Sequence, residues 1–192
     1  MNRAVFLDRD GVLVRDVHLL ARPEDIEILP GVPDALARLH RAGFKLLVVS
    51  NQPVVARGSL DEAGVRRIQG RIEEQIQLSG GPALDGFYFC PHHPQATVPA
   101  YRLICDCRKP RPLLLQQAAR DHGITLASSF MVGDRITDVI AGASAGCQTV
   151  QVETGMHLAP PIETAQPLDP AIRPVHVCAD LTVAVRWILE QP

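Results

Sequence analysis

The chain has 192 residues, of which 46% are hydrophobic and 21% are charged, and its formal net charge is −2. Residues 1–192 therefore suit a single globular domain, and the near-neutral charge gives no sign of the basic surface that a nucleic-acid partner would favour. Because no apolar run is long enough to span a membrane and residues 1–11 lack the form of a signal peptide, we expect a cytoplasmic protein without a membrane partner. We also expect a monomer.

Short apolar runs alternate with amphipathic segments along the chain. Strands are predicted at residues 4–8, 44–51, 86–90, 129–134, 148–153 and 174–178. Helices are predicted at residues 31–43, 61–81, 112–123, 134–146 and 181–191. Near-continuous apolar runs are typical of strands buried on both faces. The alternation therefore predicts an α/β fold with a doubly wound, mostly parallel, Rossmann-like sheet and helices on both faces.

The predicted helices carry apolar stripes and stop signals. In 31–43, Leu36 and Leu39 share one face and Gly43 stands at the stop position. The stripe of 61–81 consists of Val65, Ile68, Ile72 and Ile76. The proline-rich segment 159–174 is interpreted as a surface loop, because too little chain follows it to fold alone.

Polar residues end several of the predicted strands. Asp8 and Asp10 follow the first strand, Ser50 ends the second and Asp134 ends the fourth. The carboxyl ends of parallel strands are where active sites gather in such sheets. Three carboxylates without a thiolate or an imidazole favour Mg²⁺. The alternative is that Asp8 and Asp10 are turn residues, since Asp-Gly is a common turn signal, but the matching strand ends weigh against it.

Four short segments carry a resemblance to a known family. "FLDRDGVLV", "VVSNQ", "CRKP" and "MVGDRITD" follow one another in the order of the four motifs of the haloacid dehalogenase (HAD) superfamily of phosphatases. The resemblance extends from residue 4 to about residue 150, and it implies a hydrolase of phosphate esters. The chain departs from the common pattern at Val12 and at Pro53-Val54, which bears on loop shape and substrate fit rather than on the nucleophile.

The resemblance also implies roles for individual residues. Asp8 would be the nucleophile that forms an aspartyl-phosphate, and Asp10 would be the general acid and base. Magnesium would be held by Asp8, Asp134 and the carbonyl of Asp10. Ser50 and Lys109 would hold phosphoryl oxygens. Asp138 would orient Lys109 or a metal-bound water, or else be an exposed residue in the first turn of its helix.

Two pairs of soft ligands follow the second of these segments, and the last of them is the first residue of the third segment. "CPHHP" and "CDC" supply Cys90, His92, Cys105 and Cys107, which suffice to close a tetrahedral Zn²⁺ site. Spacing alone leaves His93 as an alternative to His92, and the family pattern favours His92. Four protein ligands predict a structural zinc that pins the loop 90–107. One alternative is that the cysteines bind no metal. Another is that the basic pair after them, Arg108-Lys109, is only exposed to solvent.

The expected zinc loop would also fix the exit angle of the basic pair that follows it, Arg108-Lys109. The remaining cysteines, Cys147 and Cys178, stand alone and are predicted to be core residues.

The expected zinc-binding insert limits the resemblance to two groups within the superfamily. "CPHHP…CDCRKP" is similar to the heptose 1,7-bisphosphate 7-phosphatases and to the histidinol-phosphatases, and neither group has a large cap domain. The segment 51–58 and the long loop before Cys105 favour the first group. The implied reaction is removal of the 7-phosphate of D-glycero-D-manno-heptose 1,7-bisphosphate. The alternatives are histidinol phosphate as the substrate, and a zinc-stabilised binding module that has lost catalysis.

A bisphosphate needs cations and hydrogen-bond donors beyond the reacting centre. The residues expected to contact the phosphorylated sugar are Arg9, Asp16, Asn51, Gln52, Arg57, Arg108 and Arg135.

Overall fold

The computed structural model describes residues 2–158 and 171–192. Most of the segment 159–174, predicted to be a surface loop, lies outside the described residues. All six predicted strands are confirmed: β1 (Ala4–Leu7), β2 (Lys45–Asn51), β3 (Gly86–Cys90), β4 (Phe130–Gly133), β5 (Gln148–Val152) and β6 (His176–Cys178). The predicted helices are confirmed as α1 (Val32–Arg41), α3 (Glu62–Leu78), α4 (Leu113–His122), α5 (Ile136–Ala145) and α6 (Leu181–Glu190).

Four short helical segments were not predicted. They are the one-turn helix α2 (Pro53–Ala56) and the 3₁₀ turns η1 (Pro23–Asp25), η2 (Pro99–Tyr101) and η3 (Leu126–Ser128). Segments of three or four residues are too short to show a 3.6-residue apolar period, which is why periodicity did not reveal them.

Local sequence signals explain where the longer helices begin and end. The carboxylate of Asp61 accepts a hydrogen bond of 2.6 Å from the Gly64 N–H and so caps α3. Asp180 caps α6 in the same way through the Val183 N–H. After α4 the chain adopts a left-handed conformation at Gly123 (φ 62°), which glycine allows without strain.

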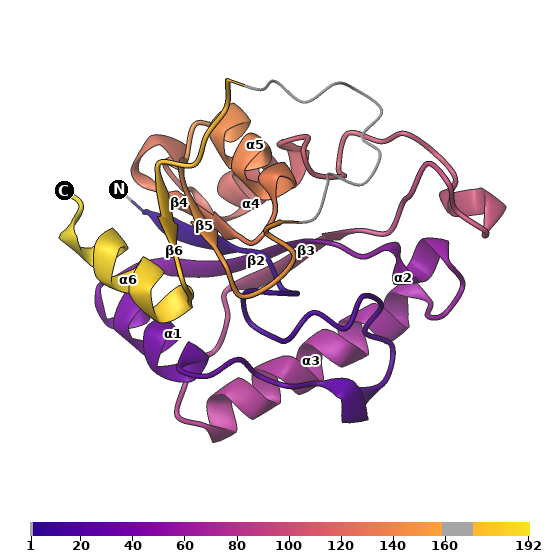
Figure 1. The fold of residues 1–192 in the computed structure, drawn as a ribbon, viewed down its shortest axis with the longest axis horizontal. Helices are drawn as coiled ribbons and strands as arrows, with labels where there is room; N and C mark the ends of the chain where they lie inside the picture. The colour runs from indigo at the N-terminus through magenta and orange to yellow at the C-terminus, as the bar shows by residue number, and fades with distance from the viewer. Residues whose placement is uncertain (1, 159–170) are drawn as a thin grey trace.

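The strands form one parallel sheet in the order β3-β2-β1-β4-β5-β6 (Figure 1). This order confirms the predicted doubly wound fold. The order reverses at β1, which pairs with β2 on one side and with β4 on the other. Among the described residues, the connections between strands contain no second sheet and no large cap. In such a sheet, ligand sites lie at the carboxyl ends of the strands near this reversal.

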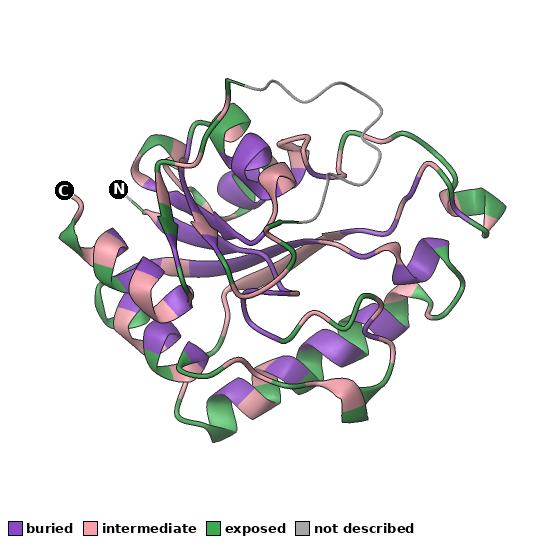
Figure 2. Cartoon of the chain, in the orientation of Figure 1, coloured by how far each residue is buried: buried purple, intermediate pink, exposed green. Residues whose placement is uncertain are grey.

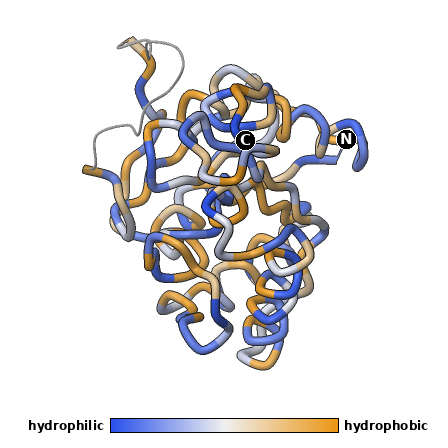
Figure 3. The backbone as a smooth tube through the Cα atoms, turned by 90° about the vertical axis from the view of Figure 1, so that its right-hand side faces the viewer, coloured by the Kyte–Doolittle hydropathy of each residue, from blue (hydrophilic) through white to orange (hydrophobic). Residues whose placement is uncertain are grey.

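Two apolar layers enclose the sheet. Helices α1, α3 and α6 pack on one face, against residues such as Val5 and Val48, and α4 and α5 pack on the other, against Phe6 and Leu47. The buried residues follow the central strands and the inward sides of the helices (Figure 2). Hydrophobic and hydrophilic residues alternate along the helical turns, as expected for helices with one face on a core (Figure 3).

Burial differs between central and edge strands. Strands β1 and β4 are buried throughout, as predicted from their apolar runs. The expectation of burial on both faces is wrong for β3 and β6, in which only Cys90 and Cys178 are buried, because these strands form the two edges of the sheet. Cys147 and Cys178 are both buried, as predicted. The described part of the chain offers no helix that is long and apolar enough for a membrane span.

Candidate active site

The end of β1 places Asp8 at the reversal of strand order. The Asp8 N–H donates to the Val132 carbonyl at 2.9 Å, so the pairing of β1 with β4 continues one residue past the strand. The Arg9 N–H donates to Asp8 Oδ1 at 2.7 Å and fixes the carboxylate. The chain then turns at Gly11, whose φ of 79° lies in the left-handed region. Sheet pairing therefore determines where the Asp8 side chain lies.

Three carboxylates gather at this point. Oxygen atoms of Asp8, Asp134 and Asp138 all lie within 4.8 Å of one another. Asp134 follows β4 and is fully buried. Its Oδ2 accepts a bond of 2.6 Å from the Met156 N–H, and its Oδ1 has no hydrogen-bond partner among the described residues. Burial, together with the charges of Asp138 and Asp8, raises the pKa of Asp134 to about 8.

This cluster fits a divalent cation. A buried carboxylate oxygen without a partner is costly, and a hard cation between crowded carboxylates would remove that cost. Oxygen donors without sulfur or imidazole suit Mg²⁺. The backbone also approaches closely, because a Cβ atom at Gly11 would lie 2.6 Å from Asp134 Oδ2, and one at Gly155 would collide with the same oxygen. Only glycine fits beside this carboxylate at either position.

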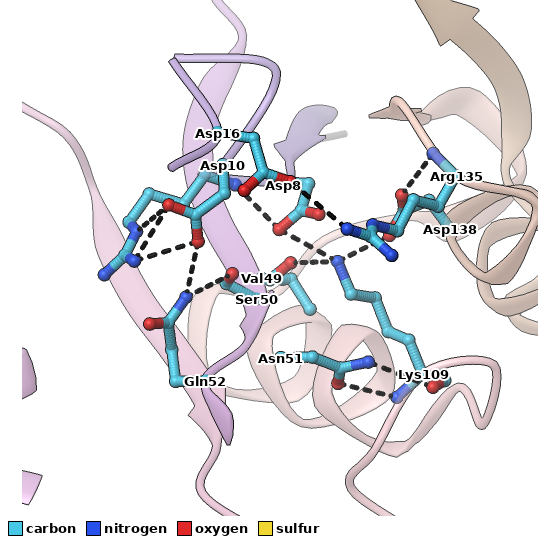
Figure 4. A network of polar contacts seen from close by, with 11 residues as sticks. Asp8, Asp10, Asp16, Val49, Ser50, Asn51, Gln52, Lys109, Arg135 and Asp138 are labelled. Atoms are coloured by element: carbon cyan, nitrogen blue, oxygen red, sulfur yellow. Dashed lines mark hydrogen bonds and ion pairs between the residues drawn. The ribbon is translucent and has the colours of Figure 1, made fainter. Parts of the chain in front are cut away.

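Lys109 supplies a buried cation next to the carboxylates (Figure 4). Its Nζ lies 2.5 Å from Asp138 Oδ1 and 3.1 Å from Asp8 Oδ1, and it donates to the Val49 carbonyl at 2.8 Å. Burial alone would lower the pKa of Lys109, but the charges of Asp138 and Asp8 outweigh it and raise that pKa above its ordinary value. The lysine therefore remains charged between two carboxylates.

Asp138 links this ion pair to the start of α5. Its Oδ2 accepts from the Arg135 N–H at 3.0 Å, as in a capping box, while its Oδ1 faces Lys109. The side chain is buried, so the alternative that Asp138 is an exposed residue of the first turn is wrong. Burial raises its pKa to about 6, against the opposing charge of Lys109.

Asn51 binds the main chain of Lys109 rather than open solvent. Its Nδ2 donates to the Lys109 carbonyl and its Oδ1 accepts from the Lys109 N–H, both at 3.0 Å. Both polar ends of the amide are therefore occupied. This geometry indicates that Asn51 positions Lys109. It argues against the substrate contact expected for Asn51 from the sequence.

Asp10 and Ser50 are joined through Gln52. The Asp10 carboxylate receives two bonds from Arg9 Nη2 at 2.8 and 2.9 Å and one from Gln52 Nε2 at 2.9 Å (Figure 4). Gln52 Nε2 also donates to Ser50 Oγ at 2.9 Å. The Asp10 side chain thus lies outside the group of three carboxylates, and only its carbonyl is left for the predicted magnesium. Arg9 is buried, and its Nη1 has no hydrogen-bond partner among the described residues.

The other residues expected to bind substrate lie in two places. Arg135 Nη2 pairs with Asp16 Oδ2 at 3.2 Å beside the carboxylates (Figure 4). Arg108 Nη1 donates to the His92 carbonyl at 3.0 Å, and burial lowers its pKa. Arg57 is exposed and donates to the Gln95 carbonyl, so it contacts the cysteine-rich loop rather than the carboxylates.

A second candidate metal centre consists of the four predicted soft ligands, and Cys90, His92, Cys105 and Cys107 lie together. The Sγ atoms of the three cysteines are 3.2 to 3.4 Å apart, and His92 Nδ1 lies 3.4 Å from Cys107 Sγ. His93 instead accepts a hydrogen bond from the Gln95 N–H. The geometry therefore selects His92 over His93.

The crowded thiols favour a soft cation. A hydrogen bond with Cys90 lowers the pKa of Cys107 to about 5, and the same bond raises the pKa of Cys90. The protein groups alone therefore stabilise one thiolate at the expense of its neighbours. A divalent ion bound by sulfur and imidazole would let all three cysteines ionise.

Several contributors to the site were not predicted from the sequence. They are the Val49 carbonyl, Gly155 and the Met156 N–H. The last two follow β5, which is the neighbour of β4 in the sheet. A glycine shortly after a predicted strand was the available signal, because glycine permits close approach of the backbone to a site.

Known proteins are similar to this chain in sequence. The family described as HAD-hydrolase-like matches residues 106–184. The D-glycero-beta-D-manno-heptose-1,7-bisphosphate 7-phosphatase of Escherichia coli (strain K12) is 40% identical over 163 residues, which cover 84% of this chain and 85% of that protein. The D-glycero-D-manno-heptose-1,7-bisphosphate 7-phosphatase of Thermosynechococcus vestitus is 39% identical over 188 residues, covering 96% and 94%.

A solved structure agrees over the whole length. The D,D-heptose 1,7-bisphosphate phosphatase from B. bronchiseptica, complexed with magnesium and phosphate, matches with a TM-score of 0.80 and 32% identity over 99% of each chain. The resemblance to HAD phosphatases that the four motifs indicated is thereby confirmed. The chain belongs to the heptose 1,7-bisphosphate 7-phosphatase family of HAD-like hydrolases.

Proposed function

We propose that this protein is a magnesium-dependent phosphatase that removes the 7-phosphate of D-glycero-D-manno-heptose 1,7-bisphosphate through an aspartyl-phosphate on Asp8. The observation that carries the proposal is the surroundings of Asp8. This carboxylate lies at the reversal of strand order, between the Lys109 ammonium at 3.1 Å and the buried Asp134. The names of the relatives support the choice of substrate.

The chemistry follows from the residues around Asp8. A carboxylate oxygen of Asp8 attacks the phosphorus, the bond from phosphorus to the sugar oxygen breaks, and Asp10 gives a proton to that oxygen. Asp10 then takes a proton from the water that attacks the aspartyl-phosphate, which releases phosphate and restores Asp8. Lys109 and the Ser50 hydroxyl stabilise the equatorial oxygens during both transfers.

Magnesium is proposed as the catalytic cofactor. It would be held by Asp8, Asp134 and the Asp10 carbonyl, and when bound it would neutralise charge on the phosphoryl oxygens. Asp134 Oδ1 has no hydrogen-bond partner within residues 2–158 and 171–192, which supports this assignment, since a buried carboxylate oxygen needs a partner. Asp138 is assigned to orienting Lys109, because its two oxygens already face Lys109 and the Arg135 N–H.

Zinc is proposed as a structural ion bound by Cys90, His92, Cys105 and Cys107. Four protein ligands leave no open position for catalysis. The ion would fix the loop 90–107 and so determine where Arg108 and Lys109 leave it. The bond from Arg108 to the carbonyl of the ligand His92 supports this coupling.

The second phosphate of the substrate would be bound by arginines near the carboxylates. Arg135 carries its charge at the start of α5, and Arg108 is held in place by His92. Guanidinium groups bind phosphate through paired hydrogen bonds. Arg9, Asp16 and Arg57 complete the proposed substrate set, while Asn51 acts through Lys109 and Gln52 acts through Asp10 and Ser50.

We further propose that residues 1–192 form a single domain with the zinc loop as its insert, acting as a cytoplasmic monomer. Size-exclusion chromatography with light scattering measures the molecular mass in solution. A dimer mass at micromolar concentration would contradict the monomer.

The decisive experiment compares substrates in the presence of Mg²⁺. Both anomers of heptose 1,7-bisphosphate are assayed beside histidinol phosphate, and ³¹P NMR identifies which phosphate is lost. We expect release of the 7-phosphate with the 1-phosphate intact, and no turnover by Asp8→Asn. A kcat/KM for histidinol phosphate equal to or above that for the bisphosphate would overturn the substrate assignment.

A further inference from the structure

We propose that Gln52 is a positioning residue that holds Asp10 and Ser50 in their working orientations, and that it does not contact the substrate. The inference rests on the proposed function, because it assigns Asp10 to proton transfer and Ser50 to a phosphoryl oxygen. It replaces the direct binding role expected for Gln52 from the sequence.

Gln52 sits where its amide reaches both groups. It follows β2, and its own N–H donates to the Cys90 carbonyl at 2.8 Å, so the pairing of β2 with β3 fixes its backbone. The two bonds of Nε2, to Asp10 Oδ2 and to Ser50 Oγ, are both 2.9 Å long (Figure 4). A primary amide has two N–H donors, and here each has an acceptor.

The acceptors around it determine which way this amide faces. Turned over, its Oε1 would face Asp10 Oδ2, which already accepts a hydrogen bond from Arg9 Nη2 at 2.8 Å, and the bond from Gln52 to Asp10 would be lost. The observed orientation therefore makes Gln52 a donor to Ser50 as well. Because Ser50 Oγ accepts this bond, its own proton points elsewhere and is free for a phosphoryl oxygen.

The same amide completes the enclosure of Asp10. Arg9 binds the carboxylate through Nη2 and Gln52 binds Oδ2 from the other side, so the carboxyl group has donors on two sides. Rotation of the group would break at least one of these bonds. Proton transfer depends on a fixed short distance to the leaving oxygen, so loss of this restraint slows the chemical step.

Burial argues against a direct contact between Gln52 and the substrate. The residue is 2% exposed, and both hydrogens of its amide nitrogen are already committed. A group that binds substrate changes KM when it is removed, whereas a group that orients catalytic residues changes kcat. The two roles therefore give different kinetic results.

The test uses Gln52→Met, which keeps the length of the side chain and removes the donors. With the heptose bisphosphate we expect kcat to fall about 10²-fold while KM stays within about twofold. With p-nitrophenyl phosphate the loss of kcat/KM, which reports the transfer to Asp8 and not the later hydrolysis, should be under about tenfold, because nitrophenolate leaves without needing a proton. Gln52→Glu should be slower still on the bisphosphate, since a carboxylate repels Asp10 and accepts the hydrogen bond of the Ser50 hydroxyl, which then no longer reaches a phosphoryl oxygen.

Gln69→Met is the matched control. Gln69 is also 2% exposed, and its amide bonds to Glu73 at 3.2 Å within α3, away from the carboxylates. This change removes the same chemistry from a buried position and should leave kcat on both substrates unchanged. Thermal unfolding of both variants checks that neither loss of activity comes from loss of fold.

A double-mutant cycle identifies the partner of Gln52. In an Asp10→Asn background, adding Gln52→Met should no longer lower the ratio of alcohol-ester to aryl-ester turnover, because the proton donor is already missing. A raised KM with unchanged kcat, or equal losses of kcat/KM on both esters, would overturn the inference. If the wild type cleaves other phosphate esters but not the bisphosphate, only the substrate assignment fails. The turnover of the variant is then compared with that of the wild type on an alcohol ester that the wild type does cleave.

Discussion

The two candidate metal centres are built in opposite ways. Asp8 and Asp134 follow central strands that are paired on both sides, so hydrogen bonds of the sheet determine their positions. Of the soft ligands, only Cys90 lies on a strand, at the edge of the sheet, and the others belong to a connection whose regular structure is the short turn η2. The fold positions the first centre, whereas a bound ion would have to position the second.

This contrast assigns different consequences to the loss of each centre. Removing a carboxylate should stop the chemistry and leave the fold intact, because the sheet holds without it. Removing the thiolates should disorder a loop, and the damage should reach the chemistry only through Arg108 and Lys109, which follow that loop. The predictions below test this contrast, from the largest expected effect to the smallest.

Asp8→Asn should lower turnover by about 10⁴-fold or more, since the amide is a far poorer nucleophile than the carboxylate. Steady-state assays with the bisphosphate and Mg²⁺ measure the loss. The zinc content should equal that of the wild type, which separates the two centres. Activity near the wild-type level would remove the aspartyl-phosphate mechanism.

The double variant Cys105→Ser/Cys107→Ser should lose its zinc and about 10²-fold in kcat, because the chain leading to Lys109 is no longer fixed. Elemental analysis measures the metal, and hydrogen exchange should show faster exchange in residues 91–107 only. The matched control is Cys147→Ser/Cys178→Ser, which changes two cysteines outside the cluster and should keep the metal. Full zinc occupancy in the first variant would contradict the proposed ligands.

Asn51→Ala should lower kcat about tenfold with little change in zinc content, because the Lys109 main chain loses two hydrogen bonds on its sheet side. This variant disturbs Lys109 from the side opposite to the zinc loop and so sharpens the comparison between the centres. A rise in KM without a fall in kcat would instead favour direct substrate binding by Asn51.

The carboxylate centre should also respond to pH through Asp134. The pKa of Asp134 is raised from 3.8 to about 8, so the folded protein holds a proton that the unfolded chain releases. Without Mg²⁺, the stability from this proton is present below pH 3.8 and is lost as the pH rises through about 8.

Magnesium competes with that proton, so its stabilising effect should increase with pH. We expect Mg²⁺ to raise Tm by about 5 °C near pH 8.5 and by less near pH 6. Differential scanning fluorimetry measures both shifts, and Asp134→Asn should abolish them. Equal shifts at the two pH values would argue against Asp134 as a ligand.

Much of the fold was predictable because strand and helix periods are visible in the sequence. The apolar run of residues 4–8 gave a correct strand, and the aspartate at its end lies in the group of carboxylates with Asp134 and Asp138. The cysteine–histidine set was predictable for a different reason, since the clustering of rare ligand types is itself a signal.

The roles of neighbouring polar residues were harder to predict. Asn51 and Gln52 follow Ser50 directly, and all of them were expected to face a phosphorylated sugar. Successive residues of an extended chain point to opposite sides, so Asn51 reaches Lys109 while Gln52 turns back to Ser50. The hydrogen-bond partner on each side depends on residues distant in sequence, so no local sequence pattern predicts it. Asp138 was ambiguous for the same reason.

The strand order has a consequence for the order of events during protein synthesis. Asp8 is translated near the start of the chain, yet β1 lies between β2 and β4, and β4 with Asp134 emerges only after two thirds of the sequence. A nascent chain that ends before β4 lacks the strand that pairs with β1 on one side, so it can neither bury the nucleophile Asp8 nor act on metabolites. The active site therefore forms in a single step late in protein synthesis, once β4 is available.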